Sequence, residues 1–269
     1  MFAERERCAQ IADELADIAR RTLQARFRRP MAVETKPDAS PVSQIDVEVE
    51  RAIRAHLAEV APEHGVIGEE FGEHQADARL VWVIDPIDGT LAFVGGRPTF
   101  VTLIGLLLDG KPVHGVIDQP ITGDRWTGGV GLQTQFNGEP AIVRRCPDLA
   151  QAWVGATDPG MFKGPLAVGF GSIAGRARQT LWGGDGYLYG QLSSGWLDIV
   201  VEAGLKLHDF AALAPIVAGA GGRITDWRGQ ELDRHSDGLV VASGDERLHG
   251  QAVSILNATL DGIAESASG

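Results

Sequence analysis

The chain is poor in cysteine and in long apolar stretches, and both shortages narrow the kinds of protein it can be. It has 2 cysteines in 269 residues. Cys8 and Cys146 form no disulfide or metal-binding pattern, which is typical of a reducing compartment. No stretch reaches the roughly 20 apolar residues that span a bilayer, and the charged N-terminus lacks the apolar core of a secretory signal. We therefore expect a cytoplasmic protein with no membrane partner.

Basic residues are also scarce. Lys and Arg number 24 against 36 Asp and Glu, which gives a formal net charge of −12. The densest basic group is Arg26, Arg28 and Arg29, which is too small to follow a nucleic-acid backbone. Nucleic acid is therefore not expected as a partner. An acidic protein that acts on an anionic substrate needs metal cations to attract it.

The apolar spacing predicts a mixture of helices and strands, in an α+β arrangement. Two helices are predicted early, over residues 3–28 and from Ser43 onward. Further along, a helix should begin at Asp209 and end near Gly221, with Pro215 as an unfavourable interior residue. A division into residues 1–135 and 136–269 is expected. The predicted strands comprise Val66-Ile67, Leu80–Ile84, residues 99–108, 111–118 and 123–128, Ile224, and Leu239–Ala242.

The densest chemical signal is the run Ile84-Asp85-Pro86-Ile87-Asp88-Gly89-Thr90. An apolar strand ends in Asp85, and Asp88 follows three residues later. Two carboxylates with a backbone carbonyl between them make a hard-oxygen set suited to Mg²⁺. Gly89 and Thr90 are placed to open a helix whose amides hold a phosphate. The alternative is a tight turn whose aspartates cap the next helix.

Three more acidic residues add to this signal. Glu69 follows the short strand Val66-Ile67, although alone it is more typical of a solvated loop. Asp209 begins an apolar helix, where a simple N-cap is the alternative. Asp46 lies three residues after Ser43, as in a capping box. Helix capping explains Asp46 or Asp209 taken alone. It does not explain why all five acidic residues occur together in this order along the chain.

These motifs resemble those of the inositol monophosphatase family, in the larger group of Mg²⁺-dependent, lithium-sensitive phosphatases. The resemblance extends from Lys36 to Trp227. It rests on Gly68-Glu69-Glu70, on Asp85-Pro86-Ile87-Asp88-Gly89-Thr90, and on His208-Asp209 leading to Ala220-Gly221-Gly222. The family more often has Trp where this chain has His208.

The resemblance implies a layered α/β/α/β/α sandwich, a homodimer and two or three Mg²⁺ ions. Glu69, Asp85 and the Ile87 carbonyl would bind the first ion, and Asp85, Asp88 and Asp209 the second. A water molecule would attack phosphorus directly, with Glu69 and a Thr90–Asp46 pair as catalytic groups. The amides of Gly89 and Thr90 would bind phosphate, and Glu202 would contact the rest of the substrate.

Several segments resemble the histidinol-phosphate phosphatase branch of the family. They are Gly96-Arg97-Pro98-Thr99-Phe100, the run Asp118-Gln119-Pro120-Ile121-Thr122-Gly123-Asp124-Arg125-Trp126, and Val201-Glu202-Ala203-Gly204-Leu205-Lys206. Leu91-Ala92-Phe93 also departs from the Asn-Phe that usually follows Thr90 in the inositol branch. For the cationic groups of histidinol, Asp185 is a candidate partner, with turn formation between glycines as its alternative.

The predicted reaction is therefore hydrolysis of L-histidinol phosphate to L-histidinol and phosphate, a step of histidine biosynthesis. Inositol-1-monophosphatase or a broad sugar-phosphate phosphatase is the chief alternative. A non-catalytic metal- or phosphate-binding regulator is the alternative from another class, and release of phosphate with Mg²⁺ separates it from an enzyme. An aspartyl-phosphate enzyme would need its two aspartates two residues apart, whereas Asp85 and Asp88 are three apart.

Overall fold

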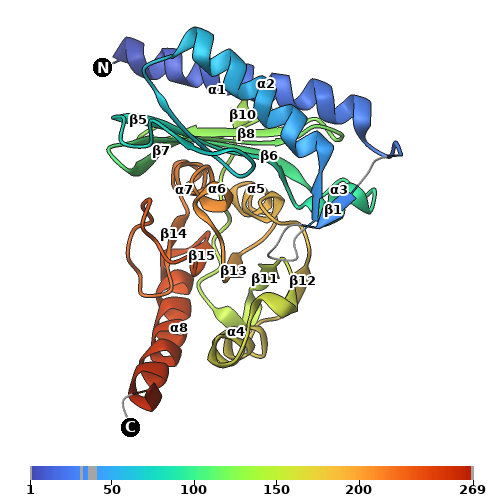
Figure 1. Cartoon of the computed structure of the whole chain (residues 1–269). Helices are drawn as coiled ribbons and strands as arrows, with labels where there is room; N and C mark the ends of the chain where they lie inside the picture. The colour runs from blue at the N-terminus through green and yellow to red at the C-terminus, as the bar shows by residue number, and fades with distance from the viewer. Residues whose placement is uncertain (1, 31–32, 36–40, 268–269) are drawn as a thin grey trace.

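The computed structural model describes residues 2–30, 33–35 and 41–267, and it has five layers (Figure 1). Two helices cover an antiparallel-rich sheet, a layer of short helices separates it from a second sheet, and two further helices cover the far side. The predicted α/β/α/β/α sandwich is therefore confirmed. Lys36, where the family resemblance begins, lies outside the described residues. Among the described residues no helix is both long and apolar enough to cross a membrane.

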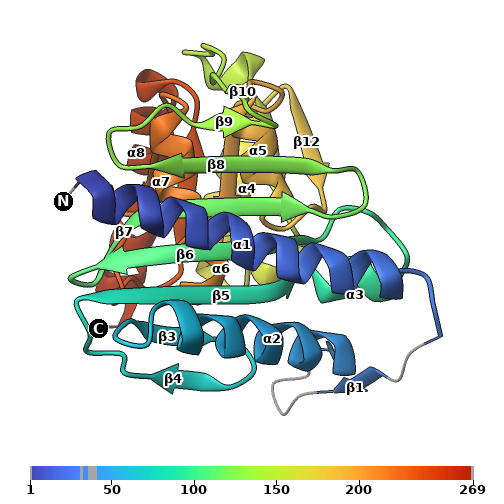
Figure 2. The ribbon, with the colours of Figure 1, turned by 90° about the horizontal axis from the view of Figure 1, so that it is seen from above.

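The first sheet has eight strands, in the order β10-β9-β8-β7-β6-β5-β3-β4. Figure 2 shows the two covering helices lying across it. β3 and β5 are parallel, whereas the other neighbours are antiparallel. The elements are α1 (Phe2–Arg26), α2 (Gln44–Val60), β3 (Gly65–Gly68), β4 (Gly72–His74), β5 (Leu80–Asp88), β6 (Val101–Leu108), β7 (Lys111–Gln119), β8 (Asp124–Gly129), β9 (Gln135–Phe136) and β10 (Glu139–Pro140), with the separate pair β1 (Val33–Thr35) and β2 (Pro41–Ser43).

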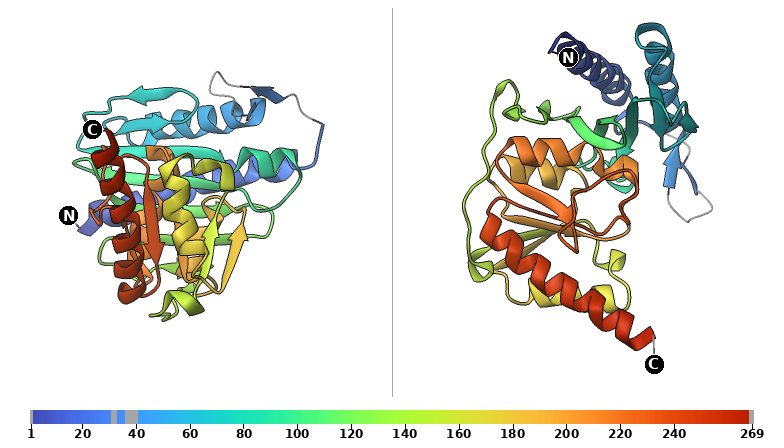
Figure 3. Two further views of the ribbon diagram at one scale, coloured as in Figure 1. Left: turned by 90° about the horizontal axis from the view of Figure 1, so that it is seen from below. Right: turned by 90° about the vertical axis from the view of Figure 1, so that its left-hand side faces the viewer.

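The second sheet has five strands, in the order β12-β11-β13-β15-β14. Figure 3 shows α4 and α8 covering its outer face. α3 (Thr90–Val94) follows β5 and lies beside the first sheet. The elements of the second half are η1 (Leu149–Gln151), β11 (Trp153–Ala156), η2 (Pro159–Met161), α4 (Pro165–Ala174), β12 (Gln179–Trp182), α5 (Tyr187–Ser193), β13 (Ile199–Glu202), α6 (Leu207–Phe210), α7 (Leu213–Gly219), β14 (Arg223–Asp226), β15 (Val240–Ser243) and α8 (Glu246–Ala267).

The apolar stripe of α2 packs onto the first sheet. Ile45, Val49, Ile53 and Leu57 are all buried, and they share one core cluster with the buried face of α1. Their spacing of four places them on a single side of the helix. The same spacing that predicted this helix therefore also determines which of its faces packs on the first sheet.

The prediction of one continuous helix from Asp209 to Gly221 is wrong. The structure has two short helices instead, α6 and α7, with a break at Ala211 and Ala212. Pro215 is the third residue of α7, in the first turn, where a missing amide hydrogen leaves no helical bond unmade. The break therefore removes the conflict that Pro215 posed in a continuous helix.

The break lies where the chain meets two glycines of the first sheet. A Cβ added to Gly105 of β6 would lie 2.9 Å from the Cβ of Ala211. A Cβ added to Gly115 of β7 would lie 2.0 Å from the carbonyl oxygen of Ala212. Only glycine allows so close an approach. The helical segment is thus seated directly on the sheet backbone.

The predicted division at residues 135 and 136 falls inside the first sheet, which continues through β10 to Pro140. The two sheets also share the middle layer, since Trp126 of β8 packs against Gly190 of α5. We retain two structural halves as a proposal, each built on one sheet.

Candidate active site

Parallel strands β3 and β5 bring the first two predicted ligands to one sheet edge. Gly68 pairs with Ile84, and the amide of Glu69 donates to the Ile84 carbonyl at 3.2 Å. Glu69 therefore lies beside Asp85, the next residue of β5. One oxygen from each carboxylate and a ring nitrogen of His208 lie within 4.8 Å of one another.

The chain between Asp85 and Asp88 is irregular, and this irregularity aims both carboxylates. β5 continues through these residues, but its register against β6 shifts between them. The amide of Ile87 donates to Oδ1 of Asp85 at 3.0 Å. Bulges of this kind redirect side chains beside functional sites. The sequence predicted a strand that ends in Asp85, whereas the structure continues β5 to Asp88 through this bulge.

Asp209 reaches the same place from the other half of the chain. It is the third residue of α6, not the N-cap, and its Oδ2 accepts from the Lys206 amide at 2.6 Å. Carboxylate oxygens of Asp85, Asp88 and Asp209 lie within 4.8 Å of one another. Asp85 belongs to this group and to the group with Glu69, which is the position that a ligand shared by two ions requires.

The electrostatics of this cluster favour cation binding. Burial, followed by the neighbouring carboxylates, raises the pKa of Asp85 and Asp88 well above the usual range, and burial also raises the pKa of Asp209. Neither Asp85 nor Asp88 is paired with a Lys or Arg side chain among the described residues. Ionised carboxylates at this density need an added positive charge. The all-oxygen group of Asp85, Asp88 and Asp209 fits Mg²⁺.

Gly89 and Thr90 form the turn after β5, and α3 begins at Thr90. Gly89 has a φ of 88°, and a Cβ there would lie 2.7 Å from Oδ2 of Asp185. Both facts call for glycine. The Thr90 hydroxyl donates to the Ile87 carbonyl at 3.1 Å. Its single proton is thus engaged with Ile87 rather than with Asp46, the partner we expected.

Asp46 nevertheless lies close to the cluster. It is 1% exposed on α2, and its carboxylate forms a third acidic group with Glu69 and Glu70, with oxygens within 4.8 Å of one another. Asp46 therefore lies beside Glu69, although its hydrogen bond to Thr90 is not formed in this structure.

Glu50 is a supporting residue that the sequence analysis missed. This fully buried carboxylate accepts from the amide of Glu70 at 2.7 Å and from that of Phe71 at 3.2 Å. Arg54, one turn later on α2, donates to it at 2.7 Å. Glu50 thus fixes the loop that carries Glu69. Its position four residues after Asp46, on the same helix face, was the available signal.

Asp185 lies against the turn formed by Gly89 and Thr90, because its Oδ2 would lie 2.7 Å from a Cβ on Gly89. Burial and then the nearby Asp209 raise its pKa to about 6, whereas Arg97 acts in the opposite direction. Its φ of 46° also marks a turn. Both sequence interpretations of Asp185, turn residue and site residue, are therefore compatible with its position.

Glu202 is less accessible than its predicted role requires. It is 2% exposed, and its two oxygens accept from the Thr157 amide at 3.1 Å and the Tyr189 hydroxyl at 3.0 Å. Burial raises its pKa to about 7. Asp185 is consequently the better placed of the two carboxylates to meet a substrate.

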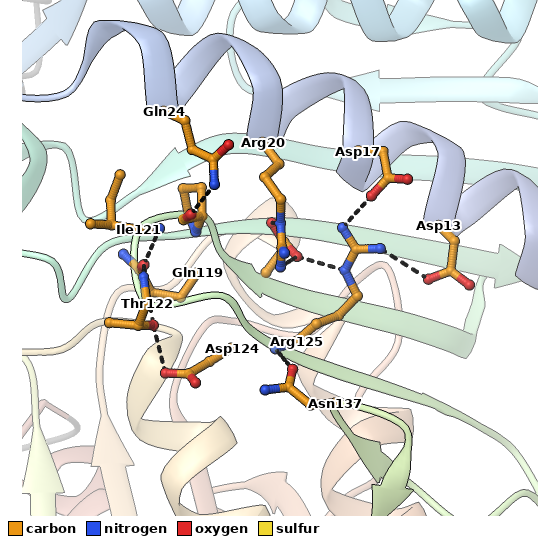
Figure 4. A network of polar contacts seen from close by, with 12 residues as sticks. Asp13, Asp17, Arg20, Gln24, Gln119, Ile121, Thr122, Asp124, Arg125 and Asn137 are labelled. Carbon is orange, nitrogen blue, oxygen red and sulfur yellow. Dashed lines mark hydrogen bonds and ion pairs between the residues drawn. The ribbon is translucent and has the colours of Figure 1, made fainter.

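One of the histidinol-type segments has a structural role. Residues 118–126 comprise the end of β7, the following turn and the start of β8, and Figure 4 shows this segment bound to α1. Arg20 and Arg125 both donate to the buried Asp118, and Arg125 also contacts Asp13 and Asp17. Asp124 accepts from the Tyr187 hydroxyl. This segment holds a helix to the sheet, so its likeness to one branch gives little information on substrate.

Comparisons with known proteins identify the family of this chain. The model of the inositol monophosphatase family matches residues 4–260. The chain belongs to the inositol monophosphatase family. The bifunctional phosphatase IMPL2 of Arabidopsis thaliana, described as chloroplastic, is 40% identical over 94% of this chain and 76% of its own. The histidinol-phosphatase of Chlorobaculum parvum is 33% identical over 87% of this chain and 91% of its own.

A solved structure described as an inositol monophosphatase from Zymomonas mobilis superposes on the chain with a TM-score of 0.87. It is 47% identical and covers 94% of this chain and 98% of its own. Family membership and these names support phosphoric monoester hydrolysis as the reaction class. The names point to different substrates, since one relative is named a histidinol-phosphatase and another an inositol monophosphatase.

Proposed function

We propose that this protein is a Mg²⁺-dependent phosphomonoester hydrolase whose substrate is L-histidinol phosphate. The observation that supports the hydrolase is the convergence of Asp85, Asp88 and Asp209 from both halves of the chain, with oxygens within 4.8 Å. When bound, Mg²⁺ supplies positive charge against the phosphate and acidifies water at the site. Glu69 and the Ile87 carbonyl complete the proposed ligand set.

The residues around this cluster bind the phosphate and accept the proton of the attacking water. The amides of Gly89 and Thr90 bind phosphate oxygens at the start of α3. Thr90 and Asp46 accept the proton of the attacking water, which requires the Thr90 hydroxyl to exchange Ile87 for Asp46 as its partner. No side chain needs to become phosphorylated in this scheme.

Histidinol phosphate is proposed because a carboxylate borders the phosphate-binding turn. Asp185 lies against Gly89, where an ammonium or imidazolium group of a substrate would meet a negative charge. Inositol carries no positive charge. Glu202 is kept as a second contact in this proposal, although its burial makes it a weaker candidate.

Inositol 1-phosphate is the second candidate, favoured by the 47% identity to the Zymomonas mobilis structure. The deciding experiment measures kcat/KM for both esters with Mg²⁺ and the full chain. We expect a higher value for L-histidinol phosphate. A higher value for inositol 1-phosphate would overturn the substrate assignment, and no phosphate release from any monoester would support a non-catalytic regulator.

A homodimer in the cytoplasm completes the proposal. The homodimer rests on the family resemblance, and the location on the two buried, unpaired cysteines, which are typical of a reducing compartment. Light scattering of the purified chain, together with imaging of a fluorescent fusion, tests the two statements separately.

A further inference from the structure

His208 adds a nitrogen donor to a cluster otherwise made of oxygen. A ring nitrogen of His208 and one oxygen each of Glu69 and Asp85 lie within 4.8 Å of one another. Two donors bound to one ion at roughly 2.0–2.3 Å lie at most about 4.6 Å apart. The three groups therefore need little movement to share an ion.

A simple ion pair with Asp209 does not account for this placement. Nε2 of His208 lies 3.5 Å from Oδ1 of Asp209, which is at the outer limit of a hydrogen bond. The other oxygen of Asp209 is held by the Lys206 amide at 2.6 Å. Only 13% of the His208 side chain is exposed. The imidazole is thus largely enclosed beside the carboxylates without a strong bond to its neighbour.

We propose that His208 is a direct ligand of the ion held by Glu69 and Asp85, and that it gives this position a preference for a borderline transition ion. The inference rests on the proposed metal centre. Imidazole suits ions such as Co²⁺, Fe²⁺ and Zn²⁺, whereas Mg²⁺ strongly prefers oxygen. The two metal positions then differ in chemistry.

The second position remains all oxygen. Asp85, Asp88 and Asp209 provide carboxylates alone, which is the donor set of Mg²⁺. The chain would therefore hold one transition ion and one Mg²⁺ side by side, with Asp85 shared between them. Replacing the nitrogen of His208 by oxygen should shift the first position toward Mg²⁺.

The direct test is electron spin-echo spectroscopy of the full chain loaded with Mn²⁺. A coordinated imidazole gives nitrogen modulation of the Mn²⁺ signal, and carboxylates give none. We expect this modulation in the wild-type protein and its loss in His208→Gln, whose side chain offers an oxygen in place of nitrogen. His235→Gln is the matched control, because His235 is exposed in a loop away from the cluster, and it should keep the modulation.

Calorimetric titrations give the second readout. His208→Gln should weaken Co²⁺ binding by at least about 10- to 100-fold, the loss that changing even an outer-shell partner of a metal ligand causes, and it should leave Mg²⁺ binding nearly unchanged. His208→Trp, with the residue more frequent in the family, is a second variant should glutamine disturb folding. Circular dichroism checks the fold of each.

The outcomes are distinct. Absence of nitrogen modulation in the wild-type protein, or equal losses of Co²⁺ and Mg²⁺ affinity in His208→Gln, would overturn the assignment of His208 as a ligand. Failure of the proposed function would appear differently, as a protein that shows nitrogen modulation but hydrolyses no phosphomonoester with both ions supplied.

Discussion

The main-chain amide of Gly186 donates a hydrogen bond to Oδ2 of Asp88, a residue 98 positions earlier in the chain. A Cβ on Gly186 would lie 2.6 Å from the same oxygen, so a larger residue would displace the carboxylate. The bond ties the loop before α5 to the end of β5. It also fixes the carboxylate of Asp88, which belongs to the cluster with Asp85 and Asp209.

Asp88→Asn should abolish most turnover while the fold persists. The amide oxygen of asparagine still accepts from Gly186, but the variant loses the negative charge that holds an ion. Losing several kcal/mol of metal-dependent stabilisation lowers kcat/KM by about 1,000-fold. The measurement is kcat/KM at saturating Mg²⁺, with circular dichroism as the control for folding. Turnover near that of the wild-type protein would contradict the proposed metal centre.

Mg²⁺ should raise the melting temperature of the wild-type chain relative to the same protein in EDTA. Ligand at about 100 times its Kd stabilises the folded state by about 2.7 kcal/mol, which corresponds to about 5 °C for a chain of this size. Asp88→Asn should lose most of this response. In EDTA it should melt above the wild-type protein, because one of three clustered charges is gone. A Mg²⁺ response in the variant equal to that of the wild-type protein would count against Asp88 as a ligand.

Glu202→Gln should remove a pH dependence from the stability of the metal-free protein. The pKa of Glu202 is about 7 in the folded state, against 4.5 as its ordinary value. Between these pH values the folded state binds the proton and the unfolded state does not. Stability is therefore greatest at low pH and falls as pH rises from 4.5 to about 7.

Because glutamine does not titrate, the stability of Glu202→Gln relative to the wild-type protein should rise by about 3 kcal/mol between pH 4.5 and 8. Urea unfolding in EDTA at several pH values measures this change. Using the pH-dependent difference cancels any constant cost of changing the hydrogen bonds to Thr157 and Tyr189. A difference that stays flat with pH would show that Glu202 is ionised in the folded protein.

Asp185→Ala should damage hydrolysis of L-histidinol phosphate more than that of p-nitrophenyl phosphate. A hydrogen bond to a charged group contributes about 1.5–3 kcal/mol, so kcat/KM for the cationic substrate should fall roughly 10- to 100-fold. The generic ester has no cation and should lose much less. Glu202→Ala is the companion variant, and its deeper burial predicts a similar loss on both esters. Equal losses in Asp185→Ala would remove the physical basis of the histidinol assignment.

Arg125→Ala should destabilise the fold without changing the chemistry. Asp118 is fully buried and is held by Arg20 and Arg125 (Figure 4). Because Arg20 still pairs with Asp118 in this variant, the loss is that of one hydrogen bond to a buried charge, about 1.5–3 kcal/mol. Chemical denaturation measures the loss, and kcat at low temperature should stay within about twofold of wild type. Asp118→Asn combined with Arg125→Ala is the control, because it removes the buried charge that Arg20 alone would have to neutralise, and it should recover part of the stability.

Local pattern was sufficient to predict most elements of the fold. The spacing of Ile45, Val49 and Ile53 predicted α2 and its buried face, because a helix repeats every 3.6 residues whatever it packs on. The strands from Val101 to Gly129 followed from runs of apolar residues broken by turns. The layer order came from the family resemblance and is confirmed.

What could not be predicted depended on contacts between distant segments. The break between α6 and α7 is set by Gly105 and Gly115, which lie about a hundred residues earlier in the chain. The Thr90 hydroxyl donates to the Ile87 carbonyl instead of Asp46, at the end of the bulged part of β5. The spacing of residues in the sequence does not reveal this bulge. His208 was visible beside Asp209, but only the fold shows that its ring shares a space with Glu69 and Asp85.

The contact of Ala211 and Ala212 with Gly105 and Gly115 has a consequence for synthesis of the chain. Glu69, Asp85 and Asp88 leave the ribosome more than a hundred residues before Asp209. The last carboxylate takes its position only when the segment joining α6 to α7 docks on the backbone of β6 and β7. The full metal site is thus a late product of folding. Tight ion binding would therefore report that both halves of the chain have been made and joined.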